Sequence, residues 1–167
     1  MPFSTFGLDP LLLRGVRELG FTRPTPIQEQ SIPPAMAGKD VLACAATGSG
    51  KTAAFGLPIL HRLMGKPRRT TRALILTPTR ELCVQITRDF EAYAKDLPGI
   101  KCVSVYGGAN IREQMRGIQR GANIVIATPG RLIDLIDRQA VDLSHVKVTV
   151  LDEADEMLNM GFQEDLT

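Results

Sequence analysis

A glycine-rich stretch that ends in Gly50–Lys51–Thr52 carries the residue types that bind nucleotide phosphates. Apolar residues Val41–Cys44 precede this stretch and the apolar-periodic segment Phe55–Leu63 follows it, which predicts a strand, a turn and a helix. Backbone N–H groups in such a turn, and at the start of the helix, can surround phosphate oxygens. The Lys51 ammonium can reach the β- and γ-phosphates, and the Thr52 hydroxyl can ligate Mg²⁺. The stretch therefore predicts a phosphate-binding loop.

One position of this stretch departs from the generic pattern G-x-x-x-x-G-K-[ST], because Ala45 stands where the first glycine belongs. A plain glycine turn that caps a helix is the alternative. It explains the glycines, but it does not explain why Lys51 and Thr52 follow them directly after a predicted strand.

A pair of carboxylates, Asp152–Glu153, ends the apolar run Val146–Leu151. A magnesium–nucleotide site needs such groups: Asp152 would hold the metal, partly through water, and Glu153 would orient and deprotonate the attacking water. Acidic residues also favour the first turn of a helix, so two helix-capping acids are the alternative. The phosphate loop earlier in the chain favours the metal site.

The elements that must position these residues are apolar strands that alternate with amphipathic helices. Such an alternation indicates an α/β fold, with a mostly parallel sheet and helices on both faces. The predicted strands are Val41–Cys44, Arg72–Thr77, Lys101–Val105, Asn123–Ala127 and Val146–Leu151. After Phe55–Leu63, the predicted helices are Glu81–Ala94, Ile111–Arg120, Arg131–Arg138 and one that begins near Ala154.

Polar clusters follow these strands, and ligands of parallel sheets bind beyond the carboxyl ends of the strands. We therefore expect the clusters to gather along one edge of the sheet. They are Thr47–Thr52, Thr77–Arg80, Gly107–Gly108, Thr128–Arg131 and Asp152–Asp155.

Two helices are predicted before the first strand. Asp9–Pro10 opens one as N-cap and first helical residue, and Gly20 ends it. Thr25–Gln28 opens the other, which runs to about Ala37. We expect Pro33–Pro34 to bend or break this second helix, because proline lacks the N–H that the helix needs.

The bulk composition is that of one folded domain, with 167 residues, 44% hydrophobic residues and a net charge of only +2. The cysteines Cys44, Cys83 and Cys102 have neither zinc nor disulfide spacing, and we expect them in the core. No signal peptide or membrane span is predicted, which points to the cytoplasm.

Read through, the acidic pair becomes Asp152–Glu153–Ala154–Asp155, or D-E-A-D. With the phosphate loop and the motifs below, the chain resembles the first RecA-like domain of the DEAD-box RNA helicases, closest to the compact bacterial type. The resemblance runs from Phe3 to Phe162. It implies a Q-motif helical region at residues 1–38, a RecA-like ATPase domain at residues 39–167, and ATP and Mg²⁺ as cofactors. Ala45 is the residue that this family places in its phosphate loop.

The resemblance assigns nucleotide roles to residues in the first third of the chain. Gly20–Gln28 matches the Q motif, in which the glutamine, here Gln28, reads the adenine edge. Phe21 and Arg23 would lie near the base, and Phe3 would support it. Thr25 and Gln28 also form a T-x-x-Q capping box, so Gln28 has a local role beside the nucleotide role. The phosphates would be held by Ala46, Thr47, Gly48, Ser49, Gly50, Lys51 and Thr52.

In the family, three further loops hold the RNA sugar–phosphate backbone. Their hydroxyls, guanidiniums and backbone amides suit phosphates and carry no base code, so sequence-independent binding is expected. Taken singly, each loop could be ordinary turn chemistry. The matching residues are Pro78, Thr79, Arg80, Gly107, Gly108, Thr128, Pro129, Gly130 and Arg131. Asp155 would couple the nucleotide site to the RNA site.

The chain also departs from the family pattern. Cys83 replaces the usual alanine, and neither the Ser–Ala–Thr motif nor the second RecA-like domain, which carries the arginine finger, is present. We expect the missing strand to leave a gap in the sheet. The chain alone should hydrolyse ATP negligibly, unwind nothing and be poorly stable.

The sequence thus predicts the ATP- and RNA-binding half of an ATP-dependent RNA helicase. An ATP-gated RNA clamp that does not unwind uses the same motifs and stays open. A different P-loop NTPase, such as a DNA helicase or transport ATPase, is opposed by the Q motif together with D-E-A-D. A non-functional fragment is the fourth possibility.

Overall fold

The computed structural model describes residues 2–39, 50–64 and 70–153. The chain forms two compact units: unit 1 comprises Met1–Gly65 and Asp89–Gly99, and unit 2 comprises Lys66–Arg88 and Ile100–Thr167. The predicted strand at residues 41–44 and the predicted helix from residue 154 lie outside the described residues.

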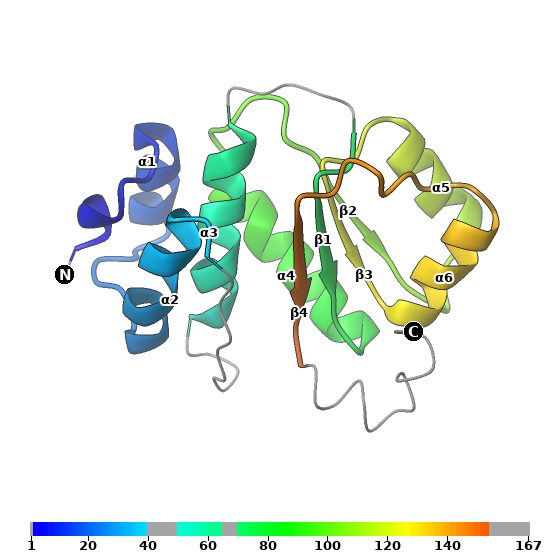
Figure 1. The fold of residues 1–167 in the computed structure, drawn as a ribbon, viewed down its shortest axis with the longest axis horizontal. Coiled ribbons are helices and arrows are strands. Elements are labelled where there is room, and N and C mark those ends of the chain that lie inside the picture. Colours follow the sequence, from blue (N-terminus) through cyan, green and yellow to red (C-terminus); the bar gives the residue numbers. More distant parts are fainter. Residues whose placement is uncertain (1, 40–49, 65–69, 154–167) are drawn as a thin grey trace. The chain divides into compact units, whose positions relative to one another are not determined.

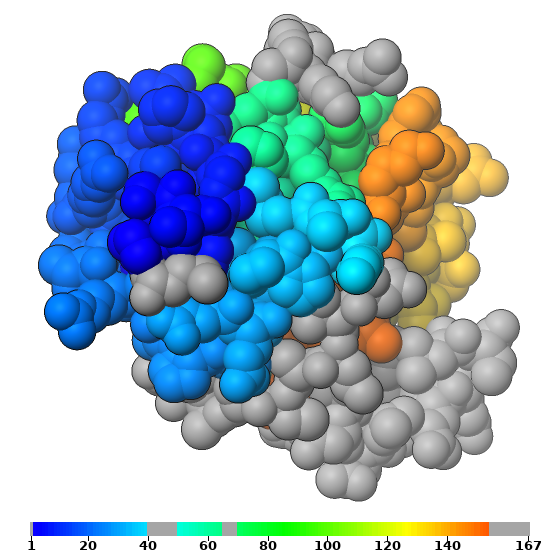
Figure 2. Space-filling view, turned by 60° about the vertical axis from the view of Figure 1, so that its left-hand side comes forward, coloured from blue at the N-terminus to red at the C-terminus, as the bar shows by residue number. Residues whose placement is uncertain are grey.

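Unit 1 is helical in the part that the structure describes. It holds the 3₁₀ helix η1 (Phe3–Phe6), the helices α1 (Pro10–Glu18), α2 (Pro26–Met36) and α3 (Lys51–Leu63), and the end of α4 (Arg80–Tyr93). On the face shown in Figure 2, η1 lies against α2. The predicted starts of α1 and α2 are confirmed, whereas η1 was not predicted.

The start of α1 shows why the sequence fixes helix ends locally. Asp9 is the N-cap, and its Oδ1 accepts a hydrogen bond from Leu11 N at 2.9 Å. Pro10 follows at the first helical position, where its missing N–H costs nothing. The Asp9 N–H itself donates to His61 Nδ1 of α3 at 3.2 Å, which ties α1 to α3.

The expected break at Pro33–Pro34 is wrong, because α2 continues through both prolines to Met36. These prolines lie in the last turns of the helix, and the carbonyls deprived of N–H partners are those of Glu29 and Gln30. Both of these residues are exposed, so water can satisfy their carbonyls.

Two glycines bring the helices of unit 1 close together. Gly56 of α3 lies against the Phe90 ring, and a Cβ on Gly56 would be 2.8 Å from Phe90 Cε1. Gly15 of α1 lies against Tyr93, whose carbonyl oxygen would be 3.0 Å from an added Cβ. The Phe55, Phe90 and Tyr93 rings then pack with centroids about 6 Å apart, at 6.0 and 6.3 Å, and form an aromatic core.

Unit 2 contains a four-stranded sheet whose order is β2-β3-β1-β4, with every pair parallel (Figure 1). The strands are β1 (Ala73–Leu76), β2 (Cys102–Val105), β3 (Ile124–Ala127) and β4 (Val148–Leu151). In register, Leu76 of β1 stands opposite Ala127 of β3 and Leu151 of β4. The carboxyl ends of these strands therefore lie at the same level, and the α/β class predicted from the sequence is confirmed.

The strands of this sheet differ in burial as their order requires. β1 and β3 are buried at every position, because each pairs on both sides with described strands. β2 is mostly half-buried, and β4 alternates half-buried with exposed residues, so that Leu151 is 46% exposed.

Helices pack on both faces of the sheet. The helices α5 (Ile111–Gln119) and α6 (Pro129–Asp137) share one core with Leu74, Leu76 and Val125, and Figure 1 shows them together on one side of the strands. At the start of α4, Cys83 contacts the sheet: its Sγ donates to the Ile126 carbonyl at 3.0 Å. Cys83 is fully buried, as expected, and burial raises the pKa of its thiol to about 12. Cys102 is only half-buried, because it lies on the edge strand β2, so the core position expected for it is wrong.

Candidate functional site

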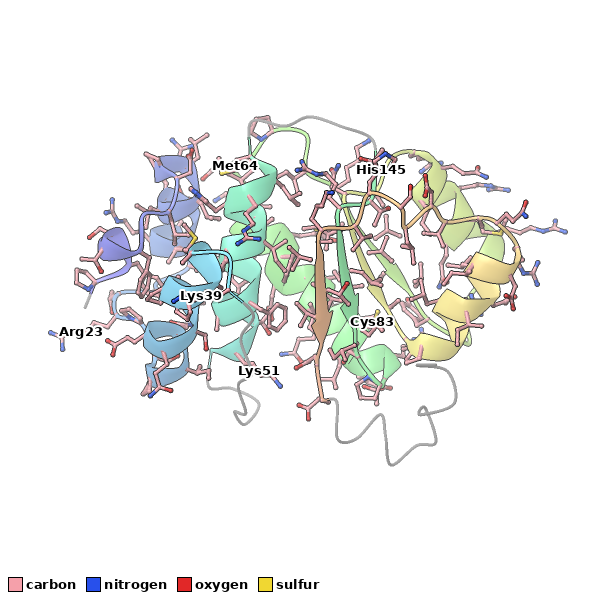
Figure 3. The ribbon with its side chains drawn as sticks, viewed as in Figure 1. Arg23, Lys39, Lys51, Met64, Cys83 and His145 are labelled. Atoms are coloured by element: carbon pink, nitrogen blue, oxygen red, sulfur yellow. The ribbon has the colours of Figure 1, made fainter. Side chains whose placement is uncertain are left out.

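The end of the predicted phosphate loop lies at the N-terminus of α3. Gly50 is the N-cap with a φ of +86°, and its carbonyl accepts the Ala54 N–H at 3.2 Å. Lys51 and Thr52 follow as the first helical residues, and Figure 3 shows Lys51 at this end of α3. The helix start expected for a phosphate loop is thus present. Ala46, Thr47, Gly48 and Ser49 lie outside the described residues.

Gln28 of α2 is tied to this glycine. Its Oε1 accepts the Thr25 N–H at 2.9 Å, and its Nε2 donates to the Gly50 carbonyl at 3.1 Å. The predicted capping box is confirmed in its Gln28 half. The Thr25 hydroxyl faces the Gln28 backbone N–H, but it does not reach hydrogen-bonding geometry with any described residue.

This arrangement leaves the amide of Gln28 only partly available. The side chain is 2% exposed, and each end of its amide already has one protein partner. One N–H and one oxygen lone pair remain by valence, which is the minimum that reading a base edge requires. The bond to Gly50 was not predicted, because residues 22 positions apart on different helices meet only through tertiary packing.

Phe3 and Phe21, which we expect near the base, line a pocket of about 290 Å³. Phe3 and Phe21 stack in its wall, with ring centroids 6.3 Å apart and planes inclined by 27°. Arg23, by contrast, is exposed and does not line this pocket. The structure therefore joins Phe3 to Phe21 as expected and leaves Arg23 apart from them. The remaining lining residues are Pro2, Ser4, Arg17 and Thr22.

Asp89 near the end of α4 is a candidate that the sequence prediction missed. The Thr52 hydroxyl donates a hydrogen bond to its carboxylate. Burial raises the pKa of Asp89, and the Thr52 hydrogen bond opposes that rise. The signal in the sequence was a carboxylate among the apolar positions Ile86, Phe90 and Tyr93 of one helix face.

The predicted acidic pair follows β4 in unit 2. Asp152 is 6% exposed, and its N–H donates to the Leu76 carbonyl at 2.8 Å, so the β4–β1 pairing reaches it. Glu153 has a φ of +55°, in the left-handed region that costs a residue with a Cβ about 1–2 kcal/mol. Such strain is concentrated at functional positions, which makes Glu153 a stronger candidate than its sequence position alone. The coupling residue Asp155 lies outside the described residues.

The remaining candidates of unit 2 lie at the carboxyl ends of β1, β2 and β3. Thr79 caps α4, because its Oγ1 accepts the Leu82 N–H at 3.2 Å. Thr128 is the N-cap of α6, which begins at Pro129 rather than at the predicted Arg131. Both threonines therefore stand at helix starts, where backbone N–H groups face outward and attract anions. Gly107–Gly108 lies between β2 and α5.

Side chains join these three loops. The Arg80 guanidinium carbon lies 5.0 Å from the centroid of the Tyr106 ring, next to Gly107. Arg131 Nη1 donates to the Ala109 carbonyl at 3.2 Å and to Gln114 Oε1 at 3.0 Å. The gathering of these three clusters at one sheet edge, which the sequence predicts, is confirmed. The sequence prediction missed Gln114, a polar residue on an amphipathic helix, for which the sequence offers no distinguishing signal.

At two glycines of this region, neither packing nor backbone conformation requires glycine. A Cβ added to Gly107 or Gly130 would meet no atom of the described residues within 4 Å, and neither residue has a positive φ. Gly108 differs, since its φ is +82°. The described residues thus leave room beside Gly107 and Gly130 for another molecule to approach the backbone closely.

Comparison with known proteins places the chain among helicases. A family model described as DEAD/DEAH box helicase matches residues 25–167. The chain is 46% identical over 164 residues to the "ATP-dependent RNA helicase CshA" of Listeria monocytogenes and 48% identical over 166 residues to the "DEAD-box ATP-dependent RNA helicase CshA" of Streptococcus pneumoniae. It is 44% identical over 164 residues to the "ATP-dependent RNA helicase DeaD" of Mycobacterium tuberculosis.

These alignments cover nearly all of this chain and less than a third of each relative. They span 98%, 99% and 98% of the chain, but 31%, 31% and 29% of the respective relatives. Among the helices that the structure describes, none has the length and apolar character needed to cross a membrane.

Proposed function

Because the chain belongs to the DEAD/DEAH box helicase family, we propose that it is the ATP- and RNA-binding part of an ATP-dependent RNA helicase. The relatives compared above carry this activity in their names. In the complete enzyme, hydrolysis of Mg-ATP would be coupled to separation of RNA strands.

One observation of unit 2 carries the RNA part of the proposal. Three loops with cations and helix starts are joined at one sheet edge, and the glycines Gly107 and Gly130 leave their backbone open there. Sugar–phosphate backbone fits such a surface, because phosphates accept hydrogen bonds from N–H, hydroxyl and guanidinium donors. We propose that RNA is held without regard to sequence, since none of these groups is a fixed base-edge reader.

The nucleotide part of the proposal assigns a role to each residue separately. Lys51 would bind the phosphates, and Gln28 with Phe21 and Phe3 would select adenine. Glu153 would act as general base toward the attacking water. We also propose that Arg23 assists near the base, although it is exposed.

Thr52 and Asp152 are the proposed ligands of Mg²⁺, Asp152 through water. The Thr52 hydroxyl suits this role, because donating its proton to Asp89 leaves its oxygen lone pairs for a cation. A bound Mg²⁺ would neutralise charge on the phosphate oxygens. The residues of this chain position it and hold the phosphates.

Steady-state ATPase assays of the full-length protein, with and without single-stranded RNA, test the proposal. RNA should stimulate turnover, and ATP should be preferred over GTP, CTP and UTP. Lys51→Ala should abolish ATP binding while the protein stays folded. Unchanged ATP affinity in Lys51→Ala, or no preference for adenine, would contradict the nucleotide assignment.

Duplex release separates unwinding from the alternative of an ATP-gated RNA clamp. A helicase releases the strands of a short RNA duplex in proportion to its ATP turnover. A clamp would turn over ATP and retain RNA without strand release. Both measurements are made on the same full-length preparation.

A further inference from the structure

A buried glutamine on α5 links two of the proposed RNA-binding loops. Gln114 is 8% exposed, and it has hydrogen-bond partners at both ends of its amide. Its Oε1 accepts from Arg131 Nη1 at 3.0 Å, and its Nε2 donates to the Tyr106 carbonyl at 3.1 Å. One side chain thus bonds to the loop after β2 and to the first turn of α6, which follows β3.

The bonds on Arg131 fix the direction of its guanidinium. Arg131 makes both of its hydrogen bonds to described residues through Nη1, which donates to Ala109 O and to Gln114 Oε1. The Nε and Nη2 groups make no hydrogen bond to any residue in the described part of the chain. A planar guanidinium held at one nitrogen presents its remaining donors in a fixed direction, the geometry that suits a phosphate.

The bond to Tyr106 extends the link to a second cation. The Tyr106 ring lies under the Arg80 guanidinium at 5.0 Å, and Tyr106 directly precedes Gly107–Gly108. Holding the Tyr106 carbonyl therefore fixes both the glycine pair and the platform on which Arg80 rests. The amide serves both partners, because its oxygen is the acceptor that Arg131 needs and its NH₂ group is the donor that the Tyr106 carbonyl needs.

We propose that Gln114 is a positioning residue that holds the guanidinium groups of Arg131 and Arg80 in the orientation in which they bind RNA phosphates. It acts through these two cations and does not itself touch RNA. The inference rests on the proposed RNA function. A glutamine that merely satisfies buried groups would affect stability alone, whereas a positioning residue also affects the number of phosphate contacts.

The test is RNA affinity as a function of salt, measured on the full-length protein with a fluorescent single-stranded RNA of mixed sequence and a non-hydrolysable ATP analogue. Gln114→Met keeps the length of the side chain and removes both hydrogen bonds. We expect affinity to fall roughly 5- to 20-fold and the slope of log K against log salt to become shallower by about 0.7, the value for one lost phosphate contact on a single strand. Arg131→Ala should have the same effect on the slope.

A double variant separates positioning from packing. If Gln114 acts through Arg131, adding Gln114→Met to Arg131→Ala should lower RNA affinity by much less than the product of the two single effects. Ile118→Val is the matched control, because it trims the same helix at a position in the hydrophobic core and removes no hydrogen bond. It should lower the melting temperature and leave the salt slope unchanged.

The outcomes distinguish this inference from the proposal beneath it. If Arg131→Ala weakens RNA binding and a folded Gln114→Met protein does not, the positioning role is wrong and the RNA surface stands. If the wild-type protein does not bind RNA, the proposed function fails first. Should Gln114→Met not fold, Gln114→Glu replaces it: it keeps the acceptor for Arg131, loses the donor for Tyr106, and should still weaken RNA binding. Wild-type affinity in that variant would overturn the inference.

Discussion

Two glycines of unit 1 and two glycines of unit 2 differ in the room that their neighbours leave for a side chain. In unit 1, Gly50 and Gly56 lie against other side chains, and an added Cβ would collide with Gln28 at the first and with Phe90 at the second. In unit 2, a Cβ added to Gly107 or Gly130 would meet none of the described residues within 4 Å. Packing within the molecule therefore explains why Gly50 and Gly56 are glycines, but it does not explain why Gly107 and Gly130 are.

This difference bears on the two proposed functions. In unit 1, Lys51 and Thr52, which we propose to bind phosphate and Mg²⁺, follow the closely packed Gly50 at the N-terminus of α3. In unit 2, side chains join the loops and helix starts that we propose to bind RNA, and Gly107 and Gly130 lie among them. A substitution at a unit 1 glycine should thus act through folding, and one at Gly107 or Gly130 should act through binding.

The largest effect is expected for Gly50→Ala. A Cβ would overlap the Gln28 amide and come within 2.8 Å of Thr25 Oγ1, and φ is +86°. Left-handed strain of about 1–2 kcal/mol adds to overpacking of about 1–3 kcal/mol. We expect about 3 kcal/mol of lost stability in chemical denaturation, together with weaker ATP binding.

Gly7→Ala is the control for that experiment. Gly7 has a φ of +79°, and an added Cβ would meet none of the described residues within 4 Å, so it carries the strain without the collision. It should cost only about 1–2 kcal/mol. An equal loss in both variants would show that the contact with Gln28 does not constrain Gly50.

Gly56→Ala should have the next largest effect, because it forces a methyl group against the fully buried Phe90 ring at 2.8 Å. Overpacking of this kind costs about 1–3 kcal/mol. Gly117→Ala on α5 provides the contrast, since its nearest neighbour is Val103 Cγ1 at 3.4 Å. There the gain in helix propensity, about 0.5–1 kcal/mol, should stabilise the protein. Thermal melts of both variants check the pair, and equal signs would contradict it.

Elements of both units are predictable from local sequence patterns. Strands β1 and β3 and the helix starts at Asp9 and Thr25 follow from local patterns, and the structure confirms them. The gathering of three unit 2 loops also followed from sequence, because the carboxyl ends of parallel strands share one edge.

Other features depend on contacts that no local pattern encodes. The Gln28–Gly50 and Gln114–Arg131 hydrogen bonds each join residues far apart in the chain, and either glutamine could have faced solvent. The continuation of α2 through Pro33–Pro34 depends on whether the freed carbonyls reach water, which burial decides and sequence does not. Local sequence patterns thus predicted the helices, the strands and the sheet edge at which the loops gather. Tertiary packing decided which side chains form the hydrogen bonds that connect them.

Alkaline pH probes the two interiors separately. Burial raises the pKa of Cys83 in unit 2 from 9.0 to about 12, and it raises the pKa of Tyr93 in unit 1 above its usual 10.0. The folded state holds each proton more tightly than the unfolded state does. The contribution of each protonated group to the free energy of unfolding is therefore complete at low pH and is lost as pH rises. The loss from Cys83 begins near pH 9, and that from Tyr93 begins near pH 10.

At pH 10 the Cys83 contribution should have fallen by about 1.4 kcal/mol, one pH unit above the unfolded pKa. Denaturation between pH 8 and pH 10 measures it, and Cys83→Ala should remove this part of the slope. If the wild-type protein and Cys83→Ala lose stability equally over this range, the thiol is not protected by burial as the structure shows.

The smallest change in stability, and the sharpest test of the comparison, is expected for Gly107→Ala and Gly130→Ala. Both have room for a methyl group and neither requires a positive φ, so stability should change by no more than about 0.5 kcal/mol. RNA affinity should nevertheless fall roughly 3- to 10-fold, because the added methyl group occupies the space through which a phosphate approaches the backbone. Filter binding at fixed salt, beside thermal melts, measures both quantities. Lost stability with unchanged RNA affinity would mean that these glycines serve the fold after all, and that the open backbone of unit 2 is not its binding surface.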